Sequence, residues 1–383
     1  MTRSTRRTAA ACVAVLIGLG AGCAAPPPQP PRTPGAAPAA PRGFTLVASG
    51  DVLPHTSIID RAHADAGGHG YDFRPMLAGA RAVVAPADLA LCHMETVYGA
   101  DGHYSGYPAF KSPPQVAAGL RATGYDSCST ASNHTLDDGA DGIARTLGAL
   151  DRAGIAHAGS GRTAAEGRGP GRLRAGGAEV AHLAYTYATN GYPLPQGRPW
   201  AVNLVDRQRI VADARAARKA GADVVVVSLH WGTEWQDEPD AQQLGLGREL
   251  TASRTHSRPD IDLILGTHAH IPQAYEKVNG VWIIYGMGDQ VAGEMFNHEG
   301  ARDARGNMST IGRFTFTRPA RPGERWQVTR AEFVPAWFDP RSDRVVNLNR
   351  AAARGAGLAG IRDRIRRTVL SRGAAEDGLL MGR

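Results

Sequence analysis

The amino-acid sequence predicts an α/β fold with a substantially parallel or mixed sheet. Short apolar runs bounded by glycine or polar residues recur along the chain, and such runs suit strands buried on both faces. Helical patterns lie between them, at residues 137–154 and 205–221, the second closed by Gly221. Strands that alternate with helices in this way are typical of an α/β sandwich. The strand runs read FTLVASGD, ADLALCHMET, YDSCSTASNH, ADVVVVSLHWG, IDLILGTHAH and VWIIYGMGD.

Three later stretches follow other patterns. Residues 172–187 and 313–338 alternate without intervening helices, which predicts antiparallel hairpins or edge strands. After residue 340 the sequence is rich in Arg, Ala and Gly, and we interpret residues 341–383 as a C-terminal helix followed by a loose tail. The main domain is therefore expected to span residues 43–340.

The N-terminus has the pattern of an export signal. Three arginines precede residues 9–22, an apolar small-residue stretch too short to span a bilayer comfortably. Its end, LGAGC, resembles the lipobox of bacterial lipoproteins, in which the cysteine is acylated, although Leu19 stands four residues before Cys23 rather than three. We expect residues 1–22 to be a lipoprotein-type signal peptide. The alternative is an uncleaved or conventionally cleaved signal, the latter giving a secreted protein.

Residues 23–42 form a Pro- and Ala-rich tether, extended and unable to build a core. Anchor, spacer and domain together predict a product held at the membrane by lipid and working outside the cytoplasm. With Cys12 in the signal and Cys23 lipidated, Cys92 and Cys128 remain, both near the ends of predicted strands. A disulfide and two separately buried thiols are both compatible with the sequence.

Composition limits the function classes. A hydrophobic content of 43% and a charged content of 21% are ordinary for a globular protein with a real core. The formal charge of +7 does not indicate nucleic-acid binding, because the arginines are scattered and form no basic stripe interleaved with aromatic residues.

Metal-binding residue types follow strand after strand. Each alone has an ordinary explanation, such as a turn residue, a helix cap or a buried histidine, but turn chemistry does not explain the repetition. Open α/β sheets place their ligand sites at the carboxyl ends of strands. On an extended backbone the two histidines of GTHAH would point the same way. The residues concerned are Asp51, Glu95, Asn133, His134, His230, His268 and His270.

This mixture of donors predicts a metal centre. Carboxylate, amide oxygen and imidazole suit Mn, Fe or Zn ions rather than a thiolate-based structural zinc. Two ions about 3.5–4 Å apart can activate a water for in-line displacement at phosphorus, and Glu95 is the candidate carboxylate to bridge them. A protonated His134 beside them could protonate the leaving oxygen.

Six motifs resemble, in order and spacing, the CapA-type family of capsule biosynthesis proteins, which is related to the calcineurin-like metallophosphoesterases. The resemblance covers roughly residues 44–340. It implies a four-layered α/β/β/α sandwich of metallophosphoesterase type and a dinuclear site. The motifs are GDVLPH, DLALCHMET, ASNHTLDDG, SLHWGTEW, GTHAHIPQAYE and WIIYGMGD.

The resemblance also assigns roles to the site residues. Asp51 and His270 would bind one metal, and Glu95 would bridge to the other. The second metal would take Asn133, His230 and His268, and His134 would be the acid.

The chain departs from the family pattern at several positions. Leu53 stands where the superfamily has a histidine, and His55 is the candidate substitute. CHME replaces the usual GNLE, which brings His93 next to the bridging position, and GMGDQ replaces SLGNF, with Asp289 where asparagine is common. Glu234 is either a residue of the metal centre or a surface carboxylate.

Three functions are compatible with these features. The first is a phosphoesterase-like hydrolase that acts on an anionic surface polymer, such as poly-γ-glutamate, or on a phosphate-containing substrate during surface-polymer production, anchoring or turnover. The second is a non-catalytic accessory subunit whose partners, in family terms, are a membrane ligase and its small membrane subunit. The third is a peptidase or amide hydrolase with the same metals.

Loops around the predicted site offer groups that could bind a substrate carboxylate or phosphate. A solvated loop face is the alternative for each of them. These groups are Tyr107, Lys111, Arg198 and Arg305.

Overall fold

The computed structural model describes residues 43–100, 102–321 and 324–383, and these described residues belong to one compact unit. Among the described residues, no helix combines the length and apolarity needed to cross a bilayer. The predicted signal, Cys23 and the tether lie outside the described residues.

The first sheet has nine strands within the described ranges. They lie in the order β18-β17-β16-β1-β2-β5-β6, with β15 paired to β1 and β19 to β17. Neighbours among β1, β2, β5 and β6 run parallel, whereas β16 and β17 run antiparallel, so the sheet is mixed. The strands are β1 (Gly43–Val52), β2 (Leu89–Met94), β5 (Ser127–Ser129), β6 (Ala156–Ala158), β15 (Asp289–Val291), β16 (Met308–Thr317), β17 (Gln327–Asp339), β18 (Arg344–Asn347) and β19 (Leu379–Met381).

The second sheet has six strands in the described part of the chain, ordered β13-β14-β12-β9-β8-β7. They are β7 (Gly171–Ala175), β8 (Ala178–Thr186), β9 (Val224–His230), β12 (Leu263–Thr267), β13 (Tyr275–Val278) and β14 (Val281–Ile284). Two short pairs stand apart, β3 (Val97–Tyr98) with β4 (Lys111–Ser112) and β10 (Arg254–Thr255) with β11 (Arg258–Pro259). The antiparallel pairs β7–β8 and β16–β17 confirm the alternation predicted at residues 172–187 and 313–338.

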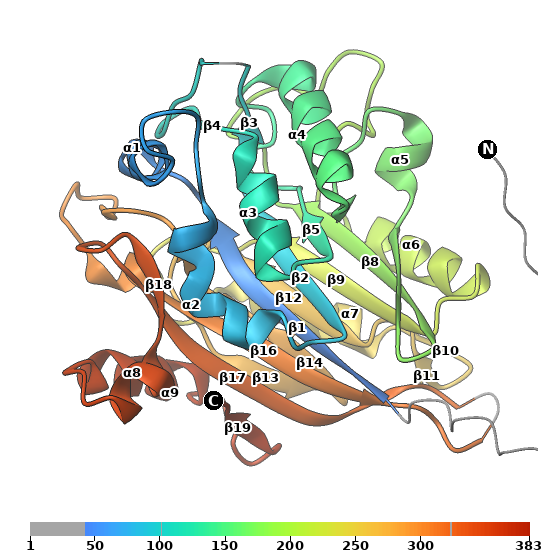
Figure 1. The fold of residues 1–383 in the computed structure, drawn as a ribbon. Coiled ribbons are helices and arrows are strands. Elements are labelled where there is room, and N and C mark those ends of the chain that lie inside the picture. Colours follow the sequence, from blue (N-terminus) through green and yellow to red (C-terminus); the bar gives the residue numbers. More distant parts are fainter. Residues whose placement is uncertain (1–42, 101, 322–323) are drawn as a thin grey trace, which may run out of the picture. The chain divides into compact units, whose positions relative to one another are not determined.

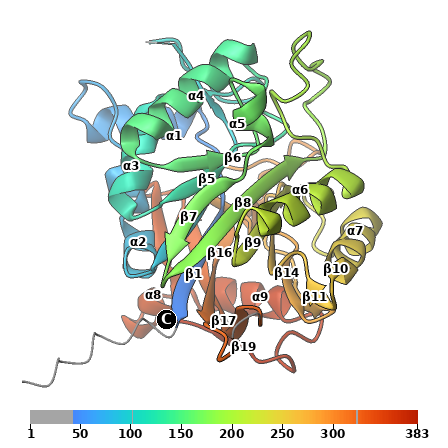
Figure 2. The ribbon, with the colours of Figure 1, turned by 90° about the vertical axis from the view of Figure 1, so that its right-hand side faces the viewer.

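The two sheets pack face to face, and helices cover their outer faces. Figure 2 shows α2, α3 and α4 on one side and α6 and α7 on the other. This is the α/β/β/α arrangement that the family resemblance implied. The helices are α1 (Thr56–Asp65), α2 (Arg74–Val84), α3 (Gln115–Thr123), α4 (Gly139–Ala153), α5 (Ala164–Arg168), α6 (Arg207–Lys219), α7 (Ala241–Ala252), η1 (Ala304–Asn307), α8 (Leu348–Ala353) and α9 (Ala359–Val369).

The valine run of β9 explains why continuous apolar stretches form these strands. Val224 and Val226 lie in the core between the two sheets, and Val225 and Val227 lie in the core under α6 and α7. Successive side chains on a strand point to opposite faces, so a strand covered on both faces needs apolar residues at every position. The valine run predicted as a strand therefore contributes to both cores.

The expectation of a loose C-terminal tail is wrong. Residues after 340 form β18, α8, α9 and β19, and β19 pairs with β17 (Figure 1). This C-terminal segment contributes buried side chains to the core between the two sheets, namely Ile365, Val369 and Leu379. Ile361, Ile365 and Val369 recur at four-residue spacing among the arginines, so α9 has an apolar face despite its charge.

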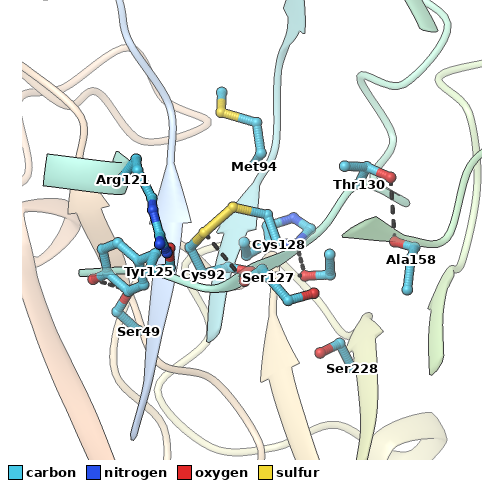
Figure 3. Close-up of a disulfide and its surroundings, with 12 residues drawn as sticks. Ser49, Cys92, Met94, Arg121, Tyr125, Ser127, Cys128, Thr130, Ala158 and Ser228 are labelled. Carbon is cyan, nitrogen blue, oxygen red and sulfur yellow. Dashed lines mark hydrogen bonds between the residues drawn. A yellow bond between two sulfur atoms is a disulfide. The ribbon is translucent and has the colours of Figure 1, made fainter. Parts of the chain in front are cut away.

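Cys92 and Cys128 form a disulfide between the neighbouring parallel strands β2 and β5 (Figure 3). The two residues are directly opposite each other in the register, with Cα atoms 4.4 Å apart. The structure therefore selects the disulfide from the two alternatives that the sequence left open.

Candidate metal centre

The carboxyl ends of four strands bring the predicted residues together. Asp51 lies near the end of β1, Glu95 directly after β2, and His230 at the end of β9. His268 and His270 follow β12, which pairs in parallel with β9 so that its last residue is opposite His230. All five are buried. Parallel pairing therefore brings residues distant in sequence to one end of the two sheets.

The two histidines of GTHAH are not placed by strand alternation. Strand β12 ends at Thr267, and His268 and His270 have left-handed backbone conformations, with φ of 91° and 58°. Non-glycine residues in this region are strained and are held there by surrounding structure. Here the amide of His268 donates to Asp51 Oδ2 (3.1 Å), and the Ala269 carbonyl accepts from the Trp235 amide (3.0 Å). The rings still converge, with centroids 6.0 Å apart.

Three buried carboxylates face these histidines with unpartnered oxygens. Within the described residues, Asp51 Oδ1, both Glu95 Oε atoms and Asp289 Oδ2 have no hydrogen-bond partner. These three residues and His270 each offer a ligand atom within 4.8 Å of the others. Burial, and then the neighbouring carboxylates, raise the pKa values of Asp51 and Glu95 well above the usual range.

A cation would relieve this arrangement. Buried anionic oxygens without partners are costly, and they become stable when they coordinate a metal. The residues present therefore fit a divalent ion, and carboxylate with imidazole is a donor set for Mn, Fe or Zn.

The imidazoles are oriented by their second nitrogen. His230 Nδ1 lies 3.0 Å from Thr267 Oγ1, and its Nε2 faces Asn133 Oδ1 (2.9 Å) and Glu95 Oε1 (3.7 Å). His270 Nδ1 lies 3.0 Å from Asp289 Oδ1. Anchoring one ring nitrogen so that the other faces the ion is the usual arrangement of metal-ligating histidines.

The pKa values of the histidines differ in direction. Burial lowers the pKa of His230 well below its ordinary value, and the nearby His268 lowers it further. A neutral imidazole is the form that binds metal. Burial also opposes the charge on His270, but Asp289 and Glu95 outweigh it and raise the pKa of His270.

His134 is held by a carboxylate that the sequence analysis did not single out. Its Nδ1 lies 2.6 Å from Asp137 Oδ2, and the same oxygen accepts from the Phe110 amide (2.7 Å). The Phe110 and His134 rings pack in a T-shaped arrangement, with centroids 4.8 Å apart, and Asn190 Nδ2 lies 3.4 Å from Nδ1. Asp137 is therefore fixed in place and directs Nε2 of His134 away from itself. The signal was present in the motif SNHTLDD, three residues after the histidine.

Two of the additional candidates are placed differently. Glu234 is 27% exposed and has Oε1 3.9 Å from Nε2 of both His268 and His270, so it borders the cluster. His55 is largely buried against Phe110, and burial lowers its pKa to about 4. His55 belongs to none of the metal-capable groups formed by the described residues. Asp289, the third candidate, lies inside the cluster.

Two of the predicted substrate-binding cations, Lys111 and Arg305, have carboxylate partners, whereas Arg198 is exposed. Lys111 pairs with Asp138 at 2.9 Å, and Arg305 pairs with Asp303 at 2.7 Å and Asp237 at 2.9 Å. These pairs occupy both side chains with structural partners, whereas Tyr107 is 77% exposed.

His93 is the residue of this site that sequence reasoning did not assign. It is buried at the end of β2, and its Nε2 lies 3.7 Å from Asp51 Oδ1. Asp51, His93 and His230 form a further group whose ligand atoms lie within 4.8 Å of one another. The replacement of the usual GNLE by CHME was the feature of the sequence that could have pointed to His93.

Comparison with known proteins identifies the family. The family described as "Bacterial capsule synthesis protein PGA_cap" matches residues 45–294. The chain belongs to this family. The PGA_cap match confirms the CapA-type resemblance, and it includes every residue of the cluster described above.

Curated relatives of this PGA_cap chain match it in part. A Mycobacterium tuberculosis protein named "Probable polyglutamine synthesis accessory protein" is 29% identical over 217 residues, covering 53% of this chain and 55% of that protein. The "PGA biosynthesis protein CapA" of Bacillus subtilis is 28% identical over 174 residues, covering 45% of this chain and 44% of that protein. The chain spans about half the length of the curated relatives it matches.

Solved structures similar to this chain include "calcineurin-like phosphoesterase YfkN" from Bacillus subtilis. It has a TM-score of 0.47 at 13% identity, covering 85% of this chain and 99% of that chain. A 5'-nucleotidase precursor from Thermus thermophilus has a TM-score of 0.45 at 16% identity, covering 82% of this chain and 58% of that chain.

Proposed function

We propose that this PGA_cap protein is a metal-dependent, phosphoesterase-like hydrolase that acts in the production, anchoring or turnover of a cell-surface polymer. The observation that carries the proposal is the buried cluster of carboxylates and imidazoles with unpartnered ligand atoms. The family description, which refers to bacterial capsule synthesis, supports the connection with a surface polymer, and the names of the relatives refer to PGA biosynthesis and polyglutamine synthesis.

The donor set suits two divalent ions that share Glu95. One ion would take the group of Asp51, Glu95, His270 and Asp289. The other would take Glu95 with His268, His230 and the amide oxygen of Asn133, which already faces His230. A pair of bound ions supplies an activated water and stabilises negative charge that develops at phosphorus.

His134 has the surroundings of a general acid. Asp137 accepts from Nδ1–H, which leaves Nε2 as the ring nitrogen able to hold a proton and deliver it to a leaving oxygen. The side chain is 9% exposed, so it lies at the border between the buried cluster and solvent, where a leaving group would depart. The Phe110 ring packed against the imidazole restricts it to this orientation.

A second candidate is a non-catalytic accessory subunit of a membrane polymer-synthesis complex. The observation in its favour is the word "accessory" in the name of the M. tuberculosis relative. Against it stands the intact ligand set, because a site without chemistry has no need of several unpartnered buried carboxylate oxygens.

We further propose that the protein works outside the cytoplasm, anchored by lipid on Cys23 and held off the membrane by residues 24–42. Replacing Cys23 with alanine should abolish incorporation of radiolabelled fatty acid and release the protein from the membrane fraction. Equal labelling of both proteins would contradict the lipid anchor, and release of the unaltered protein into the medium would favour secretion.

The catalytic proposal is tested by metal content and hydrolysis. The purified protein, loaded with Mn²⁺, Fe²⁺ or Zn²⁺ and desalted, is expected to retain about two ions per chain and to cleave a generic aryl phosphodiester. The variant His268→Ala/His270→Ala should lose both properties. A matched control, His63→Ala/His69→Ala, changes two exposed histidines and should keep both.

The outcomes separate the candidate functions. Tight metal binding with cleavage of a γ-glutamyl amide but not of phosphodiesters would make the protein an amide hydrolase. Metal binding without turnover on either class would favour the accessory subunit. A folded protein that retains no metal would exclude the metal-dependent hydrolase.

A further inference from the structure

We propose that His93 is an additional metal ligand, acting through Nε2 on the ion position that takes Asp51, beside His230 of the second position. The inference rests on the metal centre of the proposed function, and it adds an imidazole that neither the sequence motifs nor the family assignment had supplied. It concerns the residue at which CHME departs from the usual GNLE.

The position of His93 turns its ring into the cluster. It lies near the end of β2, one residue after the disulfide cysteine Cys92 and two before Glu95, and it is opposite Asp51 in the register of β1 and β2. Its ring stacks on that of His230, with centroids 4.7 Å apart and planes 24° apart. The side chain is 2% exposed, so the ring has no access to bulk solvent.

The ring nitrogens of His93 repeat the arrangement of His230. His93 Nδ1 lies 2.7 Å from Ser129 Oγ, as His230 Nδ1 lies 3.0 Å from Thr267 Oγ1. In each case a side-chain hydroxyl anchors one nitrogen and leaves Nε2 facing the carboxylates. This is the orientation expected of a metal ligand held by an outer partner.

A purely structural role for His93 does not account for Nε2. Within the described residues this atom has no hydrogen-bond partner, and the 3.7 Å to Asp51 Oδ1 exceeds hydrogen-bonding distance. His182 offers the contrast of a buried core histidine, because its two nitrogens lie 3.1 Å from Ser127 Oγ and 2.9 Å from Ser228 Oγ. His182 is satisfied by protein, whereas His93 has an unused donor atom beside an unused oxygen of Asp51.

The consequence concerns the kind of metal. With His93 as a ligand, the ion position that takes Asp51 has two imidazoles, His93 and His270, besides its carboxylates. Nitrogen ligands favour Zn, Fe and similar transition metals over Mg²⁺, which prefers oxygen. We therefore expect the centre to select zinc or iron over magnesium, and to do so less strongly without His93.

The test uses the full-length protein, with zinc and cobalt as probes. His93→Asn should weaken Zn²⁺ affinity at least about tenfold, shift the visible absorption of the Co²⁺-loaded protein, and lower the imidazole count in X-ray absorption spectra. His182→Asn is the matched control, since it changes a neighbouring buried histidine with no free nitrogen. Ser129→Ala keeps the ligand but removes its anchor, and it should weaken affinity less than His93→Asn does.

Each result bears on the proposal. Unchanged affinity, cobalt spectrum and imidazole count in folded His93→Asn, while His268→Ala/His270→Ala loses metal, would overturn the role of His93 alone. If His93→Asn does not fold, the Co²⁺ spectrum of Ser129→Ala decides instead. A spectrum identical to that of the unaltered protein would overturn the role of His93. Metal binding that depends on His93 in a protein that hydrolyses nothing would keep this inference and remove the proposed hydrolase. An unaltered protein that binds neither metal would remove both.

Discussion

Opening the Cys92–Cys128 disulfide should cost a substantial part of the stability of the domain. The bond closes a loop of 36 residues between β2 and β5. In the chain-entropy model, a loop of this length restricts the unfolded chain by about 4 kcal/mol at 25 °C. Domains of this kind are usually stable by about 5–15 kcal/mol, so the loss would be large. Reduction leaves the side-chain volume in the core almost unchanged, so a matched comparison of one protein in two redox states is available.

The assay is urea unfolding followed by tryptophan fluorescence, with and without dithiothreitol and with chelator present so that metal binding does not contribute. The unfolding free energy should fall by about 4 kcal/mol on reduction. The variant Cys92→Ala/Cys128→Ala should be insensitive to the reductant, which controls for other effects of dithiothreitol. Coincident unfolding curves for oxidised and fully reduced protein, with the redox state checked by peptide mass mapping, would refute the reasoning.

Three further predictions test the core. Burial lowers the pKa of His182 from 6.5 to about 4, so its stabilising contribution is complete above pH 6.5 and is lost as the pH falls towards 4. His182→Gln should therefore reduce the loss of unfolding free energy between pH 8 and pH 5 by about 2 kcal/mol, and an unchanged pH dependence would contradict this. Arg218→Ala would leave the buried carboxylate of Asp262 without its ion-pair partner, so the free energy of unfolding in urea should fall by about 3–5 kcal/mol. A decrease below about 1 kcal/mol would contradict a stabilising role of this pair. Gly266→Ala would bring a Cβ within 2.0 Å of a backbone carbonyl oxygen, so we expect the free energy of unfolding to fall by at least about 3 kcal/mol and metal retention to decrease. The control Gly245→Ala has open space around the new Cβ and should be neutral or slightly stabilising in thermal melts.

Local patterns were sufficient for several elements of the fold. The all-apolar run of β9 predicted a strand covered on both faces, and the alternation at residues 313–338 predicted an antiparallel pair. The period of side-chain direction depends only on the local backbone, so it can be read from a short stretch of sequence. After residue 340 a helix is present as α9, but the expected loose tail instead forms β19, whose pairing with the distant strand β17 leaves no local pattern.

The ligand types were also visible in the sequence, but the reason for their convergence was not. From the sequence we expected an extended strand to place His268 and His270 side by side. In the structure both residues are left-handed, and the segment is held by the hydrogen bonds His268–Asp51 and Trp235–Ala269. These ties come from elements far away in the chain. No pattern within GTHAH contains that information.

The sequence by itself determined the α/β class, the family and the set of residue types at the strand ends, because these depend on local periodicity and on motifs. Only the tertiary structure decided which atoms remain free to bind a metal. Thr267 orients His230, Ser129 orients His93, and Cys92 bonds to Cys128, each because strand register places two residues distant in sequence within a few ångströms. Register and packing are properties of the whole sheet, so the chemistry of the site emerges only when the sheets are assembled.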